Sequence, residues 1–138
     1  MVSITLTRAE DGFIDYVENP TRDQVQKAFE NLSPNNTEIY LWLDLDSDVR
    51  SPYLHITIDT TGTSYVVSQG DFYMGKRVIN VDLIGRNDEY AMRPLKYYAQ
   101  NGEGYSSYLK ETISKEEAER VLLYFFEHRK LPDDVTLL

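Results

Sequence analysis

Cysteine is absent from this chain of 138 residues, and histidine occurs only twice, at His55 and His128. The first absence excludes disulfide bonds, thiolate metal ligands and a cysteine nucleophile. Two histidines are too few for the usual zinc ligand sets, and no His-Glu-x-x-His pattern occurs. We therefore expect no metal ion and no cofactor in this protein.

Motifs that build phosphate sites or activate a serine are missing as well. The seven glycines match neither phosphate-loop nor dinucleotide-binding spacing. No serine lies in a Gly-x-Ser-x-Gly sequence. These absences favour a binding function over catalysis, and we assign no catalytic residue.

Long apolar runs are also missing. No stretch approaches the roughly 18 apolar residues of a membrane span, and residues 1–6 lack the basic segment and apolar core of a secretion signal. No Pro/Gly/Ser-rich linker divides the chain. We expect one domain over residues 1–138, located in the cytoplasm and not associated with a membrane.

Basic residues are scarce, since the chain contains 14 lysines and arginines but 23 acidic residues, which gives a net charge of −9. Residues 1–62 contain 11 acids and 4 bases, whereas residues 63–138 contain 12 acids and 10 bases, so the excess lies mainly in the first half. This balance disfavours direct binding of nucleic acid, which requires a basic surface. Acidity also serves solubility, so it does not define a function by itself.

The most informative stretch is residues 38–48. Its branched aliphatic residues recur at every second position, which places them on one face of an extended chain; they are Ile39, Leu41, Leu43 and Leu45. Tyr40 and Trp42, the only tryptophan, fall on the other face and lead into Asp44, Asp46 and Asp48. The pattern predicts a half-buried strand with an acidic end.

The same rules predict an α+β fold: a mainly antiparallel β-sheet with two principal helices, over about 20–32 and 115–129, packed on one face. Capping boxes mark both helix starts, at Thr21/Gln24 and Ser114/Glu117. Alternation and turn residues predict the strands, over 2–7, 39–45, 53–59, 64–68 and 78–84, with short candidates at 95–98 and 105–109. The turn at 60–63 predicts a hairpin between its flanking strands.

The acidic end of the 38–48 strand resembles the opening of a calcium loop. Counted from Asp44, however, the sixth position is Val49 instead of glycine, and the twelfth is His55 instead of glutamate. The calcium interpretation therefore fails. Two interpretations stay open with equal weight, a solvated strand end and an acidic patch that meets a basic partner.

The two histidines do not indicate an active site. His55 shares the outward phase of its strand with Asp59, but four residues at ~3.3 Å each separate them by roughly 13 Å, too far for an acid/base pair. A single histidine on a strand is more often structural. His128 lies near the end of the second helix, where a positive charge complements the helix dipole.

Tyrosine is the second compositional bias, with 11 residues. Tyrosine rings suit protein interfaces, where aromatic anchors commonly lie within a charged rim. Aromatic and acidic residues accumulate along the chain, and those that we take as candidate interface residues are Trp42, Asp44, Asp46, Asp48, Tyr53, Asp71, Tyr73, Glu89, Tyr90, Glu103, Tyr105 and Tyr108.

The order of motifs resembles family one of the immunity proteins of bacterial polymorphic toxin systems. The resemblance spans most of the chain and rests on Asn19-Pro20-Thr21 with Val25, Ala28 and Leu32, on Tyr40 to Leu45, Tyr53-Leu54-His55-Ile56 and Tyr65-Val66-Val67, and on Ser114-Lys115-Glu116-Glu117-Ala118, Tyr124-Phe125-Phe126 and Leu131-Pro132. It implies a non-enzymatic antidote that binds and neutralises the C-terminal domain of a cognate secreted toxin, often a nuclease or nucleic-acid deaminase, by occluding its active site. A toxin that acts on nucleic acid needs a basic surface, which an acidic inhibitor complements.

Two other functions remain open at this point. An acidic regulatory or DNA-mimic module would carry spaced carboxylates over much of its surface and bind nucleic-acid-binding proteins broadly. A small hydrolase would use His55 with a carboxylate that folding brings close to it.

Overall fold

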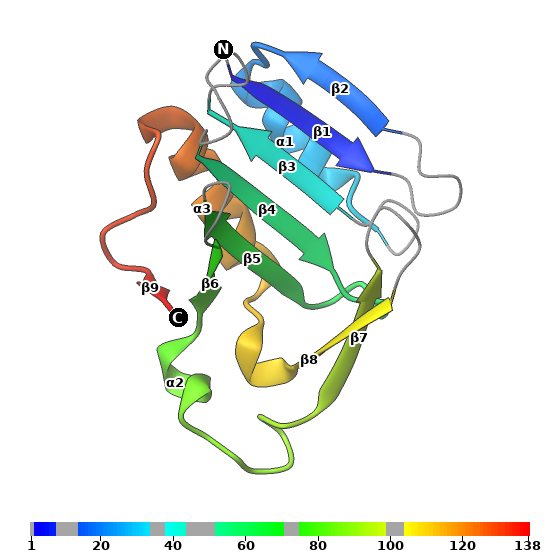
Figure 1. Ribbon diagram of the computed structural model, residues 1–138, viewed down its shortest axis with the longest axis vertical. Helices are drawn as coiled ribbons and strands as arrows, with labels where there is room; N and C mark the ends of the chain where they lie inside the picture. Colours follow the sequence, from blue (N-terminus) through cyan, green and yellow to red (C-terminus); the bar gives the residue numbers. More distant parts are fainter. Residues whose placement is uncertain (1, 8–13, 34–37, 44–51, 71–74, 99–103) are drawn as a thin grey trace.

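The computed structural model describes residues 2–7, 14–33, 38–43, 52–70, 75–98 and 104–138. Its architecture is α+β, as the sequence predicts. A mainly antiparallel sheet has two principal helices on one face, and a separate two-stranded hairpin lies at the other side of the sheet (Figure 1). Among the described residues, no helix has both the length and the apolar character needed to span a membrane.

Both principal helices begin where the caps predict. Helix α1 (Arg22–Glu30) has a complete capping box, in which Gln24 N–H donates to Thr21 Oγ1 over 3.2 Å and Thr21 N–H donates to Gln24 Oε1 over 2.8 Å. Helix α3 (Lys115–His128) begins with Ser114, whose hydroxyl oxygen accepts from Glu117 N–H. These bonds satisfy N–H groups that have no partner within the helix.

The main sheet has seven strands in the order β2-β1-β3-β4-β5-β6-β9, all pairs antiparallel. The strands are β1 (Ser3–Thr7), β2 (Ile14–Glu18), β3 (Glu38–Trp42), β4 (Tyr53–Ile58), β5 (Tyr65–Gly70), β6 (Gly75–Ile79) and β9 (Thr136–Leu137). The β4–β5 hairpin confirms the turn predicted at 60–63, where Gly62 has the positive φ of 77° that glycine adopts without strain.

The core lies between the sheet and the two helices. Ile39 and Leu41 of β3 are fully buried, as are Leu54 and Ile56 of β4, and Leu43 is 8% exposed just after β3. The helices contribute their apolar stripes to the same core, with Val25 and Phe29 from α1 and Ala118, Val121, Leu122 and Phe125 from α3. Of the alternating face predicted over residues 39–45, Ile39, Leu41 and Leu43 are confirmed as the centre of the core, and Leu45 lies outside the described residues.

A smaller layer covers part of the other side of the sheet. Strands β7 (Pro94–Tyr98) and β8 (Gly104–Tyr108) pair as a separate hairpin, followed by the short helix η1 (Leu109–Glu111). Thr60 N–H donates to Lys96 C=O over 2.8 Å, which joins β7 to the β4–β5 turn. The two short strands predicted in this region are confirmed, and each is the other's partner.

The prediction of one strand over 78–84 was wrong. Strand β6 ends at Ile79, and residues 81–84 form helix α2 (Val81–Ile84). The Asn80 side chain causes the change, because its Oδ1 accepts from Asp82 N–H over 2.9 Å and caps a helical turn. Strands β2 and β9, at the two edges of the sheet and five and two residues long, were not predicted from the sequence.

Candidate functional site

The side of the sheet opposite the helices carries a group of aromatic rings. In β3 and β4 the residues that alternate with the core residues point to this side, and antiparallel pairing sets Tyr40 opposite His55 and Trp42 opposite Tyr53. All four side chains are half-buried. We call these four residues the aromatic face.

The rings of the aromatic face contact one another closely. Tyr40 and His55 stack with centroids 4.2 Å apart and planes at 10°, and Trp42 and Tyr53 lie 4.9 Å apart at 46°. Tyr40 also stacks on Trp42, with centroids 5.7 Å apart. Such contacts fix the rings without enclosing them, so they form a preorganised surface.

A buried carboxylate supports the histidine of this face. His55 Nε2 lies 3.0 Å from Glu38 Oε1 and 3.1 Å from Thr57 Oγ1. Glu38 is 4% exposed and Thr57 is 1% exposed, and the two residues are directly opposite each other in the β3–β4 register. Folding therefore gives His55 a carboxylate partner, but it is Glu38 and not Asp59.

Asp59 has a different role. It is 1% exposed, and its carboxylate accepts from Thr63 N–H, Ser64 N–H and Thr61 Oγ1 within the β4–β5 turn. Strand alternation predicts Asp59 on the outward phase with His55, but the chain leaves β4 at Ile58 and turns there. Asp59 is thus a structural residue of the hairpin.

The pKa of Tyr40 is raised to about 12. Burial of the hydroxyl is the largest cause, and the negative charges of Glu38 and of the ionised forms of Tyr53 and Tyr105 add to it. The Tyr40 hydroxyl is therefore a neutral hydrogen-bond donor at physiological pH.

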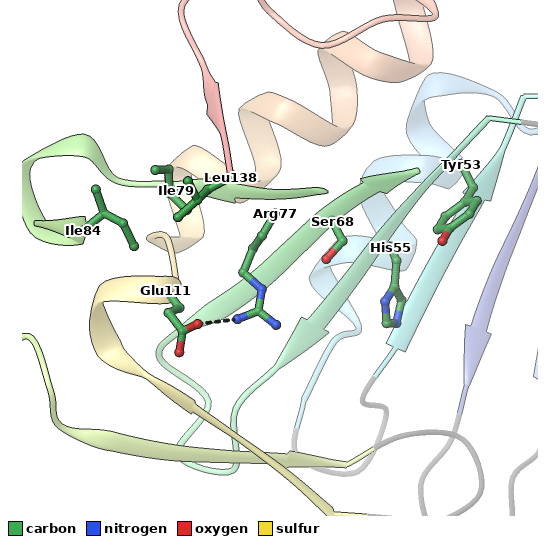
Figure 2. Close-up of a pocket in the computed structure, with 8 residues that line it drawn as sticks. All are labelled: Tyr53, His55, Ser68, Arg77, Ile79, Ile84, Glu111 and Leu138. Carbon is green, nitrogen blue, oxygen red and sulfur yellow. Dashed lines mark hydrogen bonds and ion pairs between the residues drawn. The ribbon is translucent and has the colours of Figure 1, made fainter. Parts of the chain in front are cut away.

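Beside the aromatic face lies a pocket of about 420 Å³. Figure 2 shows the eight side chains that line it, which are Tyr53, His55, Ser68, Arg77, Ile79, Ile84, Glu111 and Leu138. Arg77 Nη1 donates to Glu111 Oε2 and to Ser107 Oγ, both over 3.2 Å. Arg77 thereby joins β6 to β8 and η1 and forms the middle of the pocket.

The structure brings only some of the predicted interface residues together. Trp42 and Tyr53 are neighbours in the aromatic face, and Tyr105 of the β7–β8 hairpin stacks on Tyr97 with centroids 5.7 Å apart. Tyr108 is 44% exposed on β8, in the opposite phase of that strand from Tyr105 and Ser107.

The remaining predicted residues are separate from this face or outside the described structure. Glu89 and Tyr90 line another hollow, in the turn after α2, where Arg86 lies over the Tyr90 ring at 5.6 Å. The predicted residues that fall outside the described ranges are Asp44, Asp46, Asp48, Asp71, Tyr73 and Glu103.

Several residues of the site were not among the predicted ones. Tyr40 shares the phase of Trp42, so alternation alone could have added it. Glu38 has the same phase, but no local signal pairs it with His55, because the two residues meet through the β3–β4 register. Ser68, Arg77 and Glu111 come from three further segments and carry no recognisable motif.

Within the described ranges, no three histidine, aspartate or glutamate side chains gather closely enough to hold a metal ion. No protein-family model, curated protein or solved structure matches the chain.

Proposed function

We propose that this protein is an immunity protein, which binds and neutralises a cognate secreted toxin domain in the cytoplasm and uses the aromatic face as the centre of contact. The observation that supports the proposal best is the stacked group of Tyr40, Trp42, Tyr53 and His55 on the side of the sheet opposite helices α1 and α3. Tryptophan and tyrosine in fixed positions are typical anchors of tight interfaces, because their rings bury large areas at low entropic cost.

The surroundings of the aromatic face are consistent with this use. Tyr16 is 44% exposed on the edge strand β2, and the β1 register aligns it with Tyr40 on the same side of the sheet. Tyr105 is 43% exposed on β8. The net charge of −9 would accelerate association with a basic toxin surface through electrostatic steering.

Co-expression provides the direct test. An immunity gene lies directly downstream of the gene for a large secreted protein, so the probe is the C-terminal domain that the upstream gene encodes. We expect this chain to restore growth of cells that express that domain and to co-purify with it. Replacing Trp42 and Tyr53 with alanine should weaken binding by at least 100-fold, since each anchor typically contributes about 2 kcal/mol or more.

The matched control is Tyr90→Ala, which removes an exposed tyrosine of the turn after α2, outside the aromatic face. It should bind like the unchanged protein. Thermal unfolding of each variant separates a lost contact from a lost fold. If the upstream domain is not toxic, or if this chain leaves its toxicity unchanged, the proposal is wrong; if only Tyr90→Ala loses binding, the aromatic face is the wrong surface.

The three aspartates that follow Trp42 in the sequence provide a second test of the same proposal. Replacing Asp44, Asp46 and Asp48 with asparagine should lower the association rate with the toxin domain and reduce its dependence on salt. Unchanged binding at low ionic strength would exclude these residues from the interface. Binding to unrelated nucleic-acid-binding proteins would instead favour a DNA-mimic module.

The Glu38–His55 pair favours hydrolysis as a second candidate function, because a carboxylate that orients an imidazole beside a pocket is an arrangement found in general-base catalysis. This candidate predicts turnover of an ester or phosphoester by the purified protein, and loss of that turnover in His55→Ala. Toxin neutralisation without turnover separates the two functions.

A further inference from the structure

Arg77 has unused hydrogen-bonding capacity in the pocket. Both of its side-chain bonds, to Glu111 and Ser107, come from Nη1. Among the described residues, Nε and Nη2 have no partner, and Figure 2 shows one guanidinium nitrogen bonded to Glu111 and the other turned toward Ser68 and His55. A guanidinium edge with two adjacent N–H groups is suited to a carboxylate or phosphate group.

Two more hydrogen-bonding side chains lie in the same row of the sheet. The strand register sets His55 opposite Ser68, and Ser68 opposite Arg77. The Ser68 hydroxyl has no hydrogen-bond partner in the described part of the chain. His55 uses Nε2 for Glu38 and Thr57, which leaves Nδ1. Because Arg77 and His55 are two strand spacings apart, about 10 Å between their backbones, an oxyanion fits between their side chains.

The pocket also has an apolar side. Ile79, Ile84 and Leu138 lie on one side of Arg77, and Ser68, His55 and Tyr53 on the other (Figure 2). The volume of about 420 Å³ exceeds that of an inorganic anion and falls in the range of small-molecule sites. The lining therefore matches a ligand that has a charged head and an apolar body.

We propose that this pocket binds a small organic anion, a carboxylate or phosphate monoester whose oxygens contact Arg77 and Ser68 and whose apolar part packs on Ile79, Ile84 and Leu138. This inference does not rest on the proposed function. It concerns the binding of a small molecule by this protein and requires no toxin domain.

The negative charges of the protein do not prevent such binding. Glu111, the acidic residue in the lining, already accepts from Arg77 Nη1 and, through Oε1, from Tyr108 N–H over 2.8 Å. Exposed carboxylates farther than about 8 Å are largely screened at physiological ionic strength. Direct contact with two donors therefore outweighs the long-range repulsion.

The test compares three probes with a phenyl ring by NMR titration of the purified, ¹⁵N-labelled protein: benzoate, phenyl phosphate and benzamide, which is the neutral isostere of benzoate. We expect at least one of the two anions to shift the amide resonances of Ser68 and Arg77 in a saturable manner. Benzamide should bind at least 10-fold more weakly. Saturation by benzoate assigns a carboxylate head, and saturation by phenyl phosphate assigns a phosphate head.

Three variants locate the binding site. Arg77→Gln should weaken anion binding at least 10-fold, and Ser68→Ala several-fold. The control is Lys76→Gln, which removes a neighbouring exposed charge that points to the other side of the sheet, and it should change nothing. If Arg77→Gln does not fold, Ser68→Ala carries the test, since its hydroxyl has no bond to lose among the described residues.

Three results would overturn the proposal. They are the absence of saturable shifts with both anions, equal binding of benzamide, and unchanged anion binding by the folded Arg77 and Ser68 variants.

Discussion

His55 Nε2 and Glu38 Oε1 lie 3.0 Å apart, although 17 positions separate the two residues in the chain. Their contact joins β3 to β4 on the side of the sheet that carries the aromatic face, and Tyr40 stacks on the same imidazole. Because Glu38 is nearly inaccessible to water, its carboxylate depends on partners supplied by the fold.

Replacing His55 with phenylalanine should keep a ring beside Tyr40 but leave Glu38 without its histidine partner. We expect a loss of about 2–4 kcal/mol in the free energy of unfolding, because a buried carboxyl group loses its hydrogen-bond partner. Urea unfolding monitored by circular dichroism measures this loss. In the His55→Phe/Glu38→Leu double variant, where both polar groups are gone, most of it should be recovered; strictly additive losses would contradict this explanation.

Tyr40 should make stability fall at alkaline pH. Its pKa is about 12 in the folded state and about 10 in the unfolded state, so the folded state retains the proton longer. The resulting stabilisation is fully present below pH 10 and is lost as the pH rises from 10 to 12. Tyr40→Phe removes the titrating hydroxyl, so its stability should decline less steeply over this range. If chemical unfolding shows the same decline in the free energy of unfolding for both proteins, the pKa of Tyr40 is not raised in the folded state.

Asp59 should be essential for the β4–β5 turn. Asp59→Ala removes the acceptor of two backbone N–H groups and one hydroxyl, with an expected cost of about 2–3 kcal/mol. Asp59→Asn keeps the oxygen that serves Thr63 and Ser64 and should cost about 1 kcal/mol. Differential scanning calorimetry compares the two variants, and equal melting temperatures would argue against these bonds as the cause.

Arg129 ends α3 in the left-handed conformation, with φ 58° and ψ 26°, while its N–H donates to Phe125 C=O over 2.8 Å. Glycine adopts this conformation without strain, so Arg129→Gly should stabilise the protein by about 0.5–1 kcal/mol. Arg129→Ala is the matched control, because it removes the same charge but retains Cβ. The explanation fails if both variants shift the urea midpoint equally.

Alternation and capping in the sequence determined most of the fold. Residues 39–43 form the core face because a strand repeats every two residues, and Thr21 and Ser114 start helices because their side chains satisfy free backbone N–H groups. These are local effects, which any chain with the same neighbouring residues would share. Even Trp42 and Tyr53 could be placed on one surface by this reasoning.

The tertiary structure alone decided which distant residues meet. Glu38 reaches His55 through the register of two strands, and Arg77 reaches Ser107 and Glu111 because the β7–β8 hairpin folds back toward β6. Strand register and hairpin placement depend on packing across the whole molecule, so no local pattern encodes them. For this reason the sequence predicted the strands that carry the aromatic face, whereas the contact of Glu38 with His55 and the pocket around Arg77 emerged only from the fold.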